Sequence, residues 1–300
     1  MIALLAAPSN LGLRPPRPGS VPGTVNAPEA LRAAGLFRRM TTAGAVDAGV
    51  VRCDRYVDDD ATRPSGHVRN EVALISHARL LADRLSGLLD IGQTPLVIGG
   101  DCSILIGIGV ALSRRGGAGL VHVDGHTDFR HPGNSDDCAS VAGEDLAAAV
   151  GLHWPAIADI DGAGPYFVPA HVAHIGHRED DTEAVETRRT LGAVIAAREA
   201  MEQPTSTTAA AARRVAGSGY WLQVDVDVLD PSVMPAVDSP DPGGFSADAL
   251  TALLAELAPG AIGASITVFD PDLDPDGRYA ALVSDIVATG LARLGSERSP

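Results

Sequence analysis

Two acidic segments, far apart in the chain, carry the residues best suited to chemistry. One spans residues 123–128 and places Asp124, His126 and Asp128 at alternate positions, and the other spans 224–231 and begins with Asp225 and Asp227. Alternate residues share one face of a strand, so the side chains of each segment can point together. Carboxylates crowded at a buried strand end repel one another, and a cation converts that repulsion into coordination. This carboxylate-rich set suits Mn²⁺ and exceeds what one tetrahedral ion needs, so we expect two Mn²⁺ ions.

The alternative interpretation is a solvated acidic surface, because Asp-x-Asp pairs are common in turns. Each acidic segment, however, follows directly on an apolar run, residues 119–123 in one case and 220–224 in the other. An apolar run followed by acids is typical of a buried strand that ends at a site. The two segments together therefore favour metal binding.

Composition narrows the class of protein. The 300 residues are 45% hydrophobic and carry a formal net charge of −15, with no lysine. This charge argues against a nucleic-acid partner, since phosphates attract basic surfaces. No run approaches the roughly 18 apolar residues of a membrane span, and the short apolar start reads as a strand, not a signal peptide. Three cysteines without paired spacing fit a reducing, cytoplasmic location.

Strand-like and helix-like runs alternate along the whole chain. The predicted strands span residues 2–7, 94–99, 119–123, 171–175, 220–226 and 263–269. The predicted helices span residues 28–40, 71–89, 104–115, 183–201, 247–258 and 280–294, and residues 203–219 are interpreted as a connection or helix end. This alternation predicts one α/β domain over residues 1–300, with a parallel sheet covered on both faces. Functional groups in such folds lie at the carboxyl ends of the strands, where both acidic segments fall.

Four segments in chain order resemble the ureohydrolase family, the arginases and agmatinases. They are Gly99–Ser103, Val123–Phe129, Asp225–Pro231 and Ser239–Gly244, and the run 23–36 resembles the family's N-terminal stretch. The resemblance implies a three-layer α/β/α fold with a mostly parallel sheet of about eight strands. It also implies a small guanidino substrate and a homo-oligomer, a trimer or hexamer. In that family a hydroxide that bridges two manganese ions attacks the guanidinium carbon and releases urea, or a substituted urea, and an amine.

The resemblance also implies a role for each matching residue. Asp124 and Asp225 would bridge the two ions. Cys102 and Asp128 would complete the shell of one ion, and His126 and Asp227 the shell of the other; Asp128 and His126 are also the predicted catalytic residues. Carboxylates behind the site would orient the ligands, and they are Asp101 and Asp230. For Asp230, a cap at the strand end before Pro231 is a second interpretation.

The first departure from the family pattern is Cys102, which stands where the family has a metal-binding histidine. A thiolate is softer and more negative than an imidazole, so it could change metal affinity or choice. Buried cysteines are also often inert packing residues. Both roles stay open for Cys102, and the position favours ligation.

Further departures concern the substrate. Val268 stands where the family has the glutamate that pairs with the guanidinium, and Asp270 or Asp272 could substitute for it. Ala142 stands where the arginase proton-shuttling histidine lies, and His131 or His177 are alternatives. The remaining predicted substrate contacts are Ser140, a weak match to a carboxylate-binding position, and Asp181, which matches an acid that contacts an α-amino group.

These departures favour a modified, less basic guanidine as substrate, for example N-hydroxyarginine, because its recognition depends less on a carboxylate partner. Three alternatives stay open. The chain could be an ordinary arginase or agmatinase, a relative that cleaves another C–N bond such as an amide, or a metal-depleted homologue without catalytic activity.

Overall fold

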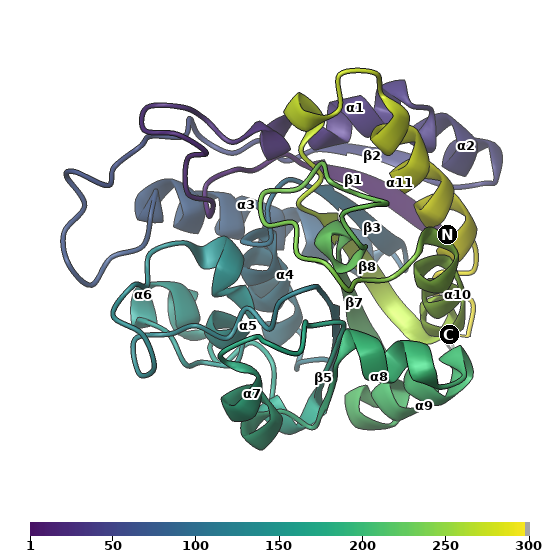
Figure 1. The fold of residues 1–300 in the computed structure, drawn as a ribbon. Coiled ribbons are helices and arrows are strands. Elements are labelled where there is room, and N and C mark those ends of the chain that lie inside the picture. Colours follow the sequence, from purple (N-terminus) through teal and green to yellow (C-terminus); the bar gives the residue numbers. More distant parts are fainter. Residues whose placement is uncertain (298–300) are drawn as a thin grey trace.

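The computed structural model describes residues 1–297, which form one parallel sheet between two layers of helices (Figure 1). The eight strands lie in the order β2-β1-β3-β8-β7-β4-β5-β6 and all pair in parallel. The predicted three-layer fold is therefore confirmed. The strands are β1 (Ile2–Ala7), β2 (Val46–Val50), β3 (Thr94–Gly99), β4 (Leu120–Val123), β5 (Val172–Ile175), β6 (Ala193–Ile195), β7 (Tyr220–Asp225) and β8 (Ala261–Thr267).

The helices cover the sheet because each strand sends alternate side chains to opposite faces. On β1 and β3, Leu5 and Val97 join one buried cluster, whereas Leu4 and Leu96 join the other. The first cluster lies under α3 (Glu71–Asp90), α4 (Ile104–Ser113), α5 (Asp145–Ala149) and α6 (Pro155–Ala158). The second lies under α1 (Ala27–Ala33), α2 (Leu36–Thr42), α8 (Ala197–Glu202), α9 (Thr205–Ala216), α10 (Ala247–Leu257) and α11 (Arg278–Gly290).

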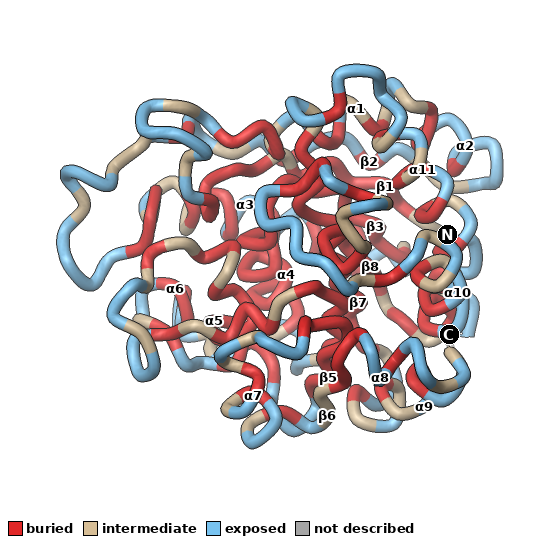
Figure 2. Tube along the Cα trace, in the orientation of Figure 1, coloured by how far each residue is buried: buried red, intermediate tan, exposed pale blue. Residues whose placement is uncertain are grey.

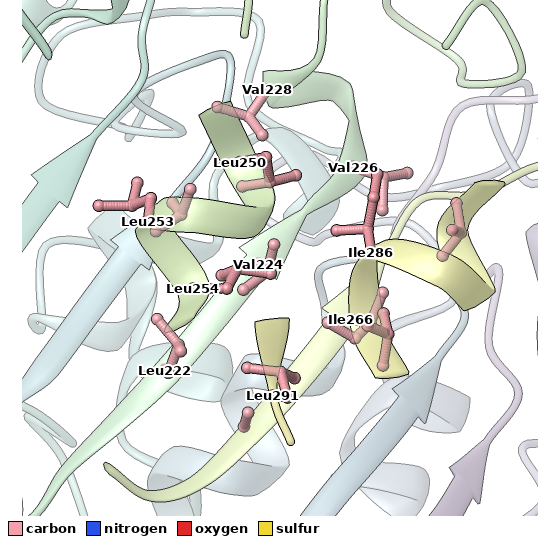
Figure 3. Close-up of a cluster of buried hydrophobic side chains, with 14 of the residues drawn as sticks. Leu222, Val224, Val226, Val228, Leu250, Leu253, Leu254, Ile266, Ile286 and Leu291 are labelled. Atoms are coloured by element: carbon pink, nitrogen blue, oxygen red, sulfur yellow. The ribbon is translucent and has the colours of Figure 1, made fainter. Parts of the chain in front are cut away.

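The burial pattern follows these layers. Figure 2 shows buried backbone concentrated in the sheet and the inner faces of its helices, with exposed loops around the rim. In Figure 3, leucines of α10 and residues of α11 pack onto the side chains of β7 and β8. Among residues 1–297, none of the helices has both the length and the apolar character needed to cross a membrane.

Three predicted boundaries were wrong, each for a local reason. The helix expected over 183–201 is α7 (Ala184–Thr190), the edge strand β6 and α8, because β6 pairs with β5 after Gly192. The helix expected over 28–40 is divided into α1 and α2 at Gly35, whose φ of 93° no helix accommodates. The segment 203–219 contains the helix α9, and the edge strand β2, with its mostly exposed side chains, was not predicted.

The order of the central strands determines which loops meet. The carboxyl ends of β3, β8, β7, β4 and β5 follow one another along one edge of the sheet. Val123 of β4 is in register with Val224 of β7, so the next residues, Asp124 and Asp225, are neighbours across the strands. His122 of β4 is likewise in register with His174 of β5. Strand pairing therefore brings the two acidic segments together.

Candidate metal centre

One half of the centre is built by the residues that follow β4 and β7. Asp225 ends β7, and its Oδ1 accepts a hydrogen bond of 2.7 Å from the backbone N–H of Asp227 in the turn 226–228. Asp124 follows β4, and its Oδ1 accepts one of 2.7 Å from the N–H of His126. The N–H of Gly125 donates to Asp227 Oδ1 at 3.0 Å and joins the two turns. These bonds fix the carboxylates toward one point.

His126 lies between these acids. Its Nδ1 is 2.9 Å from Asp227 Oδ2 and 3.9 Å from Asp124 Oδ1. Its Nε2 lies 3.1 Å from Asp241 Oδ2, a contact that orients the ring. Ligand atoms of Asp124, His126 and Asp227 all lie within 4.8 Å of one another, which is close enough for one ion.

The other half of the centre is built around Cys102, just beyond β3. A Cβ on Gly100 would lie 2.0 Å from the backbone of Ser9, so only glycine permits the turn that leads to Cys102. The Cys102 Sγ is 2.7 Å from Asp225 Oδ2 and 3.0 Å from Thr267 Oγ1. The thiol therefore points into the cluster, as predicted from its place in the chain.

Asp128 completes this half, and its φ of 46° is the left-handed conformation that turns its carboxylate inward. Its ligand atoms lie within 4.8 Å of those of Cys102, while Cys102, Asp124 and Asp225 form a second group within the same limit. The structure thus brings all six predicted metal ligands into one contiguous cluster. Their ligating role stays a prediction.

The electrostatics of the cluster fit a cationic guest. Burial, reinforced by the neighbouring carboxylates, raises the pKa of Asp124, Asp128 and Asp225 well above the ordinary range. Burial alone would lower the pKa of His126, but the charges of Asp227 and Asp124 outweigh it and raise that pKa to about 12. Burial works to raise the pKa of Asp227, yet the His126 imidazole holds it below its usual value. The cluster lacks positive charge for its carboxylates.

The donor set therefore fits divalent ions. Asp124 Oδ2 is buried and has no hydrogen-bond partner among the described residues, which is costly unless a cation binds it. Hard oxygens and imidazole suit Mn²⁺, while the thiol adds one softer donor. The burial that removes Cys102 from water, together with the charge of Asp225, raises the pKa of the thiol well above its usual value. A thiolate at Cys102 thus needs a bound cation.

The two carboxylates predicted to stand behind the ligands have different surroundings. Asp101 is fully buried and accepts hydrogen bonds from the backbone N–H groups of Gly12 and Ser103, each at 2.9 Å. It therefore fixes the turn that carries Cys102. Asp230 accepts from the N–H groups of Ser232 and Gly243, and these bonds lower its pKa to about 2. Its environment matches the interpretation as a cap that holds the loop after β7.

A pocket of about 140 Å³ opens over the cluster and is floored by His126, Asp128, Asp225 and Asp227. A cavity of about 150 Å³ holds benzene, so this space accepts a guanidine head group. Val268 lies in its wall, 3% exposed. Val268 has a φ of 71°, unusual for a β-branched residue, and its N–H donates to Gly100 O at 2.7 Å.

Carboxylates also line the pocket beyond its floor. Asp181 lies there, and both its oxygens accept hydrogen bonds from Thr127, at 2.8 Å each. Asp238 lies there too, in the loop after β7, and sequence reasoning missed it because no motif marks it. Asp270 instead accepts from the N–H groups of Gly23 and Asp272, so it anchors a loop away from the lining.

The other predicted contacts lie apart from this lining. The Ser140 hydroxyl accepts a hydrogen bond of 3.4 Å from Arg69 Nε, so its substrate contact stays a prediction without support from its placement. His131 is paired with Glu186 at 3.2 Å. The Nε2 of His177 accepts from Arg188 at 3.3 Å. Neither imidazole reaches into the pocket as placed.

The comparisons with known proteins decide the family. The family model described as "Arginase family" matches residues 2–292. The chain belongs to the arginase family. It is 26% identical to an arginase from Agrobacterium fabrum, over 98% of this chain and 92% of that protein. It is 30% identical to a formimidoylglutamase from Aeromonas salmonicida, over 71% of this chain and 66% of that protein.

The solved structure of Bacillus caldovelox arginase superposes with a TM-score of 0.85 at 26% identity, and the match covers 97% of each chain. These comparisons confirm the resemblance drawn from the four segments. The named relatives in this family are hydrolases that act on C–N bonds of amidines. They differ in substrate, so the family alone does not fix the substrate of this chain.

Proposed function

We propose that the protein is a binuclear-metal hydrolase that cleaves a guanidino C–N bond and releases urea, or a substituted urea, and an amine. One observation supports this most strongly: six potential ligands converge at the carboxyl edge of the sheet, beneath a pocket sized for a guanidine. Two Mn²⁺ ions are the proposed cofactors, since oxygen donors dominate the set. When bound, such a pair supplies a water molecule acidified enough to attack at neutral pH.

The residues divide between the two proposed ion positions. Cys102 and Asp128 serve the side nearest β3, and His126 and Asp227 serve the opposite side. Asp124 and Asp225 lie in both groupings, which supports bridging roles. His126 and Asp128 also face the pocket, so they are placed to orient the reacting groups and to hold a proton there.

The wall of the pocket supports a weakly basic guanidine as substrate. At the position where the family has its guanidinium-pairing glutamate, this chain presents the apolar Val268. A fully charged guanidinium next to a buried apolar side chain loses hydration without compensation. N-hydroxyarginine or a similar modified guanidine suffers less, and Asp181 is available near the entrance for a cationic amino group.

A screen of substrates tests this proposal. We expect kcat/KM for N-hydroxyarginine to exceed that for arginine and agmatine in the Mn²⁺-loaded protein. Efficient turnover of plain arginine would favour an ordinary arginase, and turnover of an amide would favour a different C–N substrate. A fully metallated protein that hydrolyses none of these would favour the non-catalytic homologue.

The setting of this activity is proposed from the sequence and the family. We propose that residues 1–300 form one domain, which the single sheet from β1 to β8 supports. A cytoplasmic location and a homo-oligomer, trimeric or hexameric, complete the proposal. Mass measurement of the purified protein in solution tests the oligomer.

A further inference from the structure

A buried carboxylate that no motif predicted faces the metal centre. Asp145 begins α5 and is 0% exposed, yet neither of its oxygens has a hydrogen-bond partner among residues 1–297. Its carboxylate lies within 4.8 Å of the ligand atoms of both Cys102 and Asp128. A buried carboxylate without donors is costly, so its environment requires a proton or a cation.

The neighbouring residue shows what a structural carboxylate looks like in this loop. Glu144 is equally buried, but its Oε1 accepts from the N–H groups of Ala139 and Ser140, and its Oε2 pairs with His153 Nε2 at 2.9 Å. Every oxygen of Glu144 is thus used to anchor the chain. Asp145 does no such work, although it is the next residue. Its orientation toward Cys102 and Asp128 is therefore informative.

A histidine meets the same position from the sheet. His122 of β4 shares a strand face with Asp124, is 0% exposed, and has an Nε2 without a hydrogen-bond partner among the described residues. This Nε2 lies 3.6 Å from Asp124 Oδ2 and 3.7 Å from Asp145 Oδ1. Both distances exceed a hydrogen bond. Two ligands about 2.1 Å from one ion at wide angles lie roughly 3.4 to 3.6 Å apart.

The far side of the imidazole agrees with a ligating role. His122 Nδ1 is 3.0 Å from His174 Nδ1, so one of the two rings donates a proton to the other. With the proton on His122 Nδ1, the lone pair of Nε2 is free and points at Asp124 and Asp145. Metal-binding histidines commonly fix their tautomer through such a bond from the second ring nitrogen.

We propose that Asp145 and His122 are ligands of the ion held by Cys102 and Asp128. The proposal rests on the metal centre proposed above. In it, an imidazole from β4 and a carboxylate from α5 compensate for the histidine that Cys102 replaces. The first ion position then has a donor set that the four segments shared with the family do not contain.

The experiment measures Mn²⁺ binding to the whole chain by equilibrium dialysis with elemental analysis, and by electron paramagnetic resonance. Asp145→Asn and His122→Gln should each weaken one of the two ions by roughly 100-fold or more, since even residues behind a ligand contribute 10- to 100-fold. The spectrum should change from that of a coupled pair to that of isolated Mn²⁺. Asp274→Asn, a buried carboxylate that accepts from the N–H of Ala280, is the matched control and should bind as the unaltered chain does.

Thermal melting in chelator adds a readout that needs no metal. Asp145→Asn removes an unpartnered buried charge, so its metal-free form should melt at or above the temperature of the unaltered protein, while its gain from Mn²⁺ should shrink. If Asp145→Asn does not fold, His122→Gln makes the same test.

The outcomes separate this inference from the proposed function. Two ions bound with unchanged affinity in both variants would overturn the inference and favour a proton shared between Asp145 and Asp128. An unaltered chain with one ion, which Asp145→Asn loses, would retain the inference and overturn the binuclear centre. An unaltered chain that binds no Mn²⁺ would overturn both.

Discussion

Replacement of Cys102 by histidine opposes a packing cost to a gain in metal binding. The thiol is fully buried, and its Sγ is 2.7 Å from Asp225 Oδ2. Imidazole is larger than the thiol, and overpacking of a core typically costs 1–3 kcal/mol, so in chelator we expect Cys102→His to lower the free energy of unfolding by about this amount. An imidazole ligand suits Mn²⁺ better than a buried thiol. Each tenfold gain in affinity adds about 1.4 kcal/mol of stability at saturating metal.

The assay is calorimetric melting in chelator and across a Mn²⁺ titration, with dissociation constants from isothermal titration. Cys102→Ser keeps a small polar group but removes the soft donor, so it should weaken Mn²⁺ binding. Cys53→Ser, a partly buried thiol outside the cluster, is the matched control and should change neither quantity. If Cys102→His and Cys102→Ser both leave Mn²⁺ affinity unchanged, Cys102 is a packing residue and the reasoning is refuted.

Three further predictions concern substrate and pH. Val268→Glu should raise kcat/KM for arginine and agmatine by roughly 30- to 1000-fold, the worth of a charge-assisted hydrogen bond of about 2–4 kcal/mol, while Val268→Gln should recover little; equal effects from both would exclude a charge effect. Asp238→Asn should lower kcat/KM for cationic guanidines several-fold and leave the Mn²⁺ dissociation constant unchanged, as steady-state kinetics and dialysis will show. In chelator, the melting temperature should fall as pH rises from about 4 toward neutrality, because buried carboxyls such as Asp124 and Asp225 have raised pKa values and bind more protons folded than unfolded. Mn²⁺ should reverse this trend, and a flat profile in chelator would contradict the assigned pKa directions.

The sequence predicted the parts of the site that local pattern determines. Asp124 and Asp225 each follow an apolar strand, and parallel pairing of β4 with β7 then brings them together. The same reasoning places Cys102 beyond β3. A short alternating pattern at the end of a strand therefore carries enough information to place a side chain at the edge of the sheet.

The sequence did not reveal residues whose role depends on tertiary surroundings. Asp145 begins a short helix and resembles any helix-capping acid, and His122 resembles any polar residue in a strand. Only burial and the absence of hydrogen-bond partners distinguish them. Asp230 shows the reverse case, because a motif position suggested a role behind the ligands and its hydrogen bonds to Ser232 and Gly243 are those of a loop cap.

Edge elements were also hard to predict. Strand β2 exposes most of its side chains and strand β6 has three residues, so neither shows the apolar run of a central strand. The helix α9 is rich in alanine and threonine and lacks the strong apolar stripe of α10, although Ala209 and Ala212 are fully buried. Small side chains bury a helix without giving it a marked hydrophobic pattern.

The release of urea or hydroxyurea from guanidines, measured against the number of Mn²⁺ ions bound per chain, tests the central claim most directly. With N-hydroxyarginine as substrate, we predict no release in chelator, a rise with added Mn²⁺, and a plateau at two ions per chain. Asp124→Asn should abolish both the second ion and the release. Release that persists without metal, or a chain with two bound ions that cleaves no guanidine, would contradict the account.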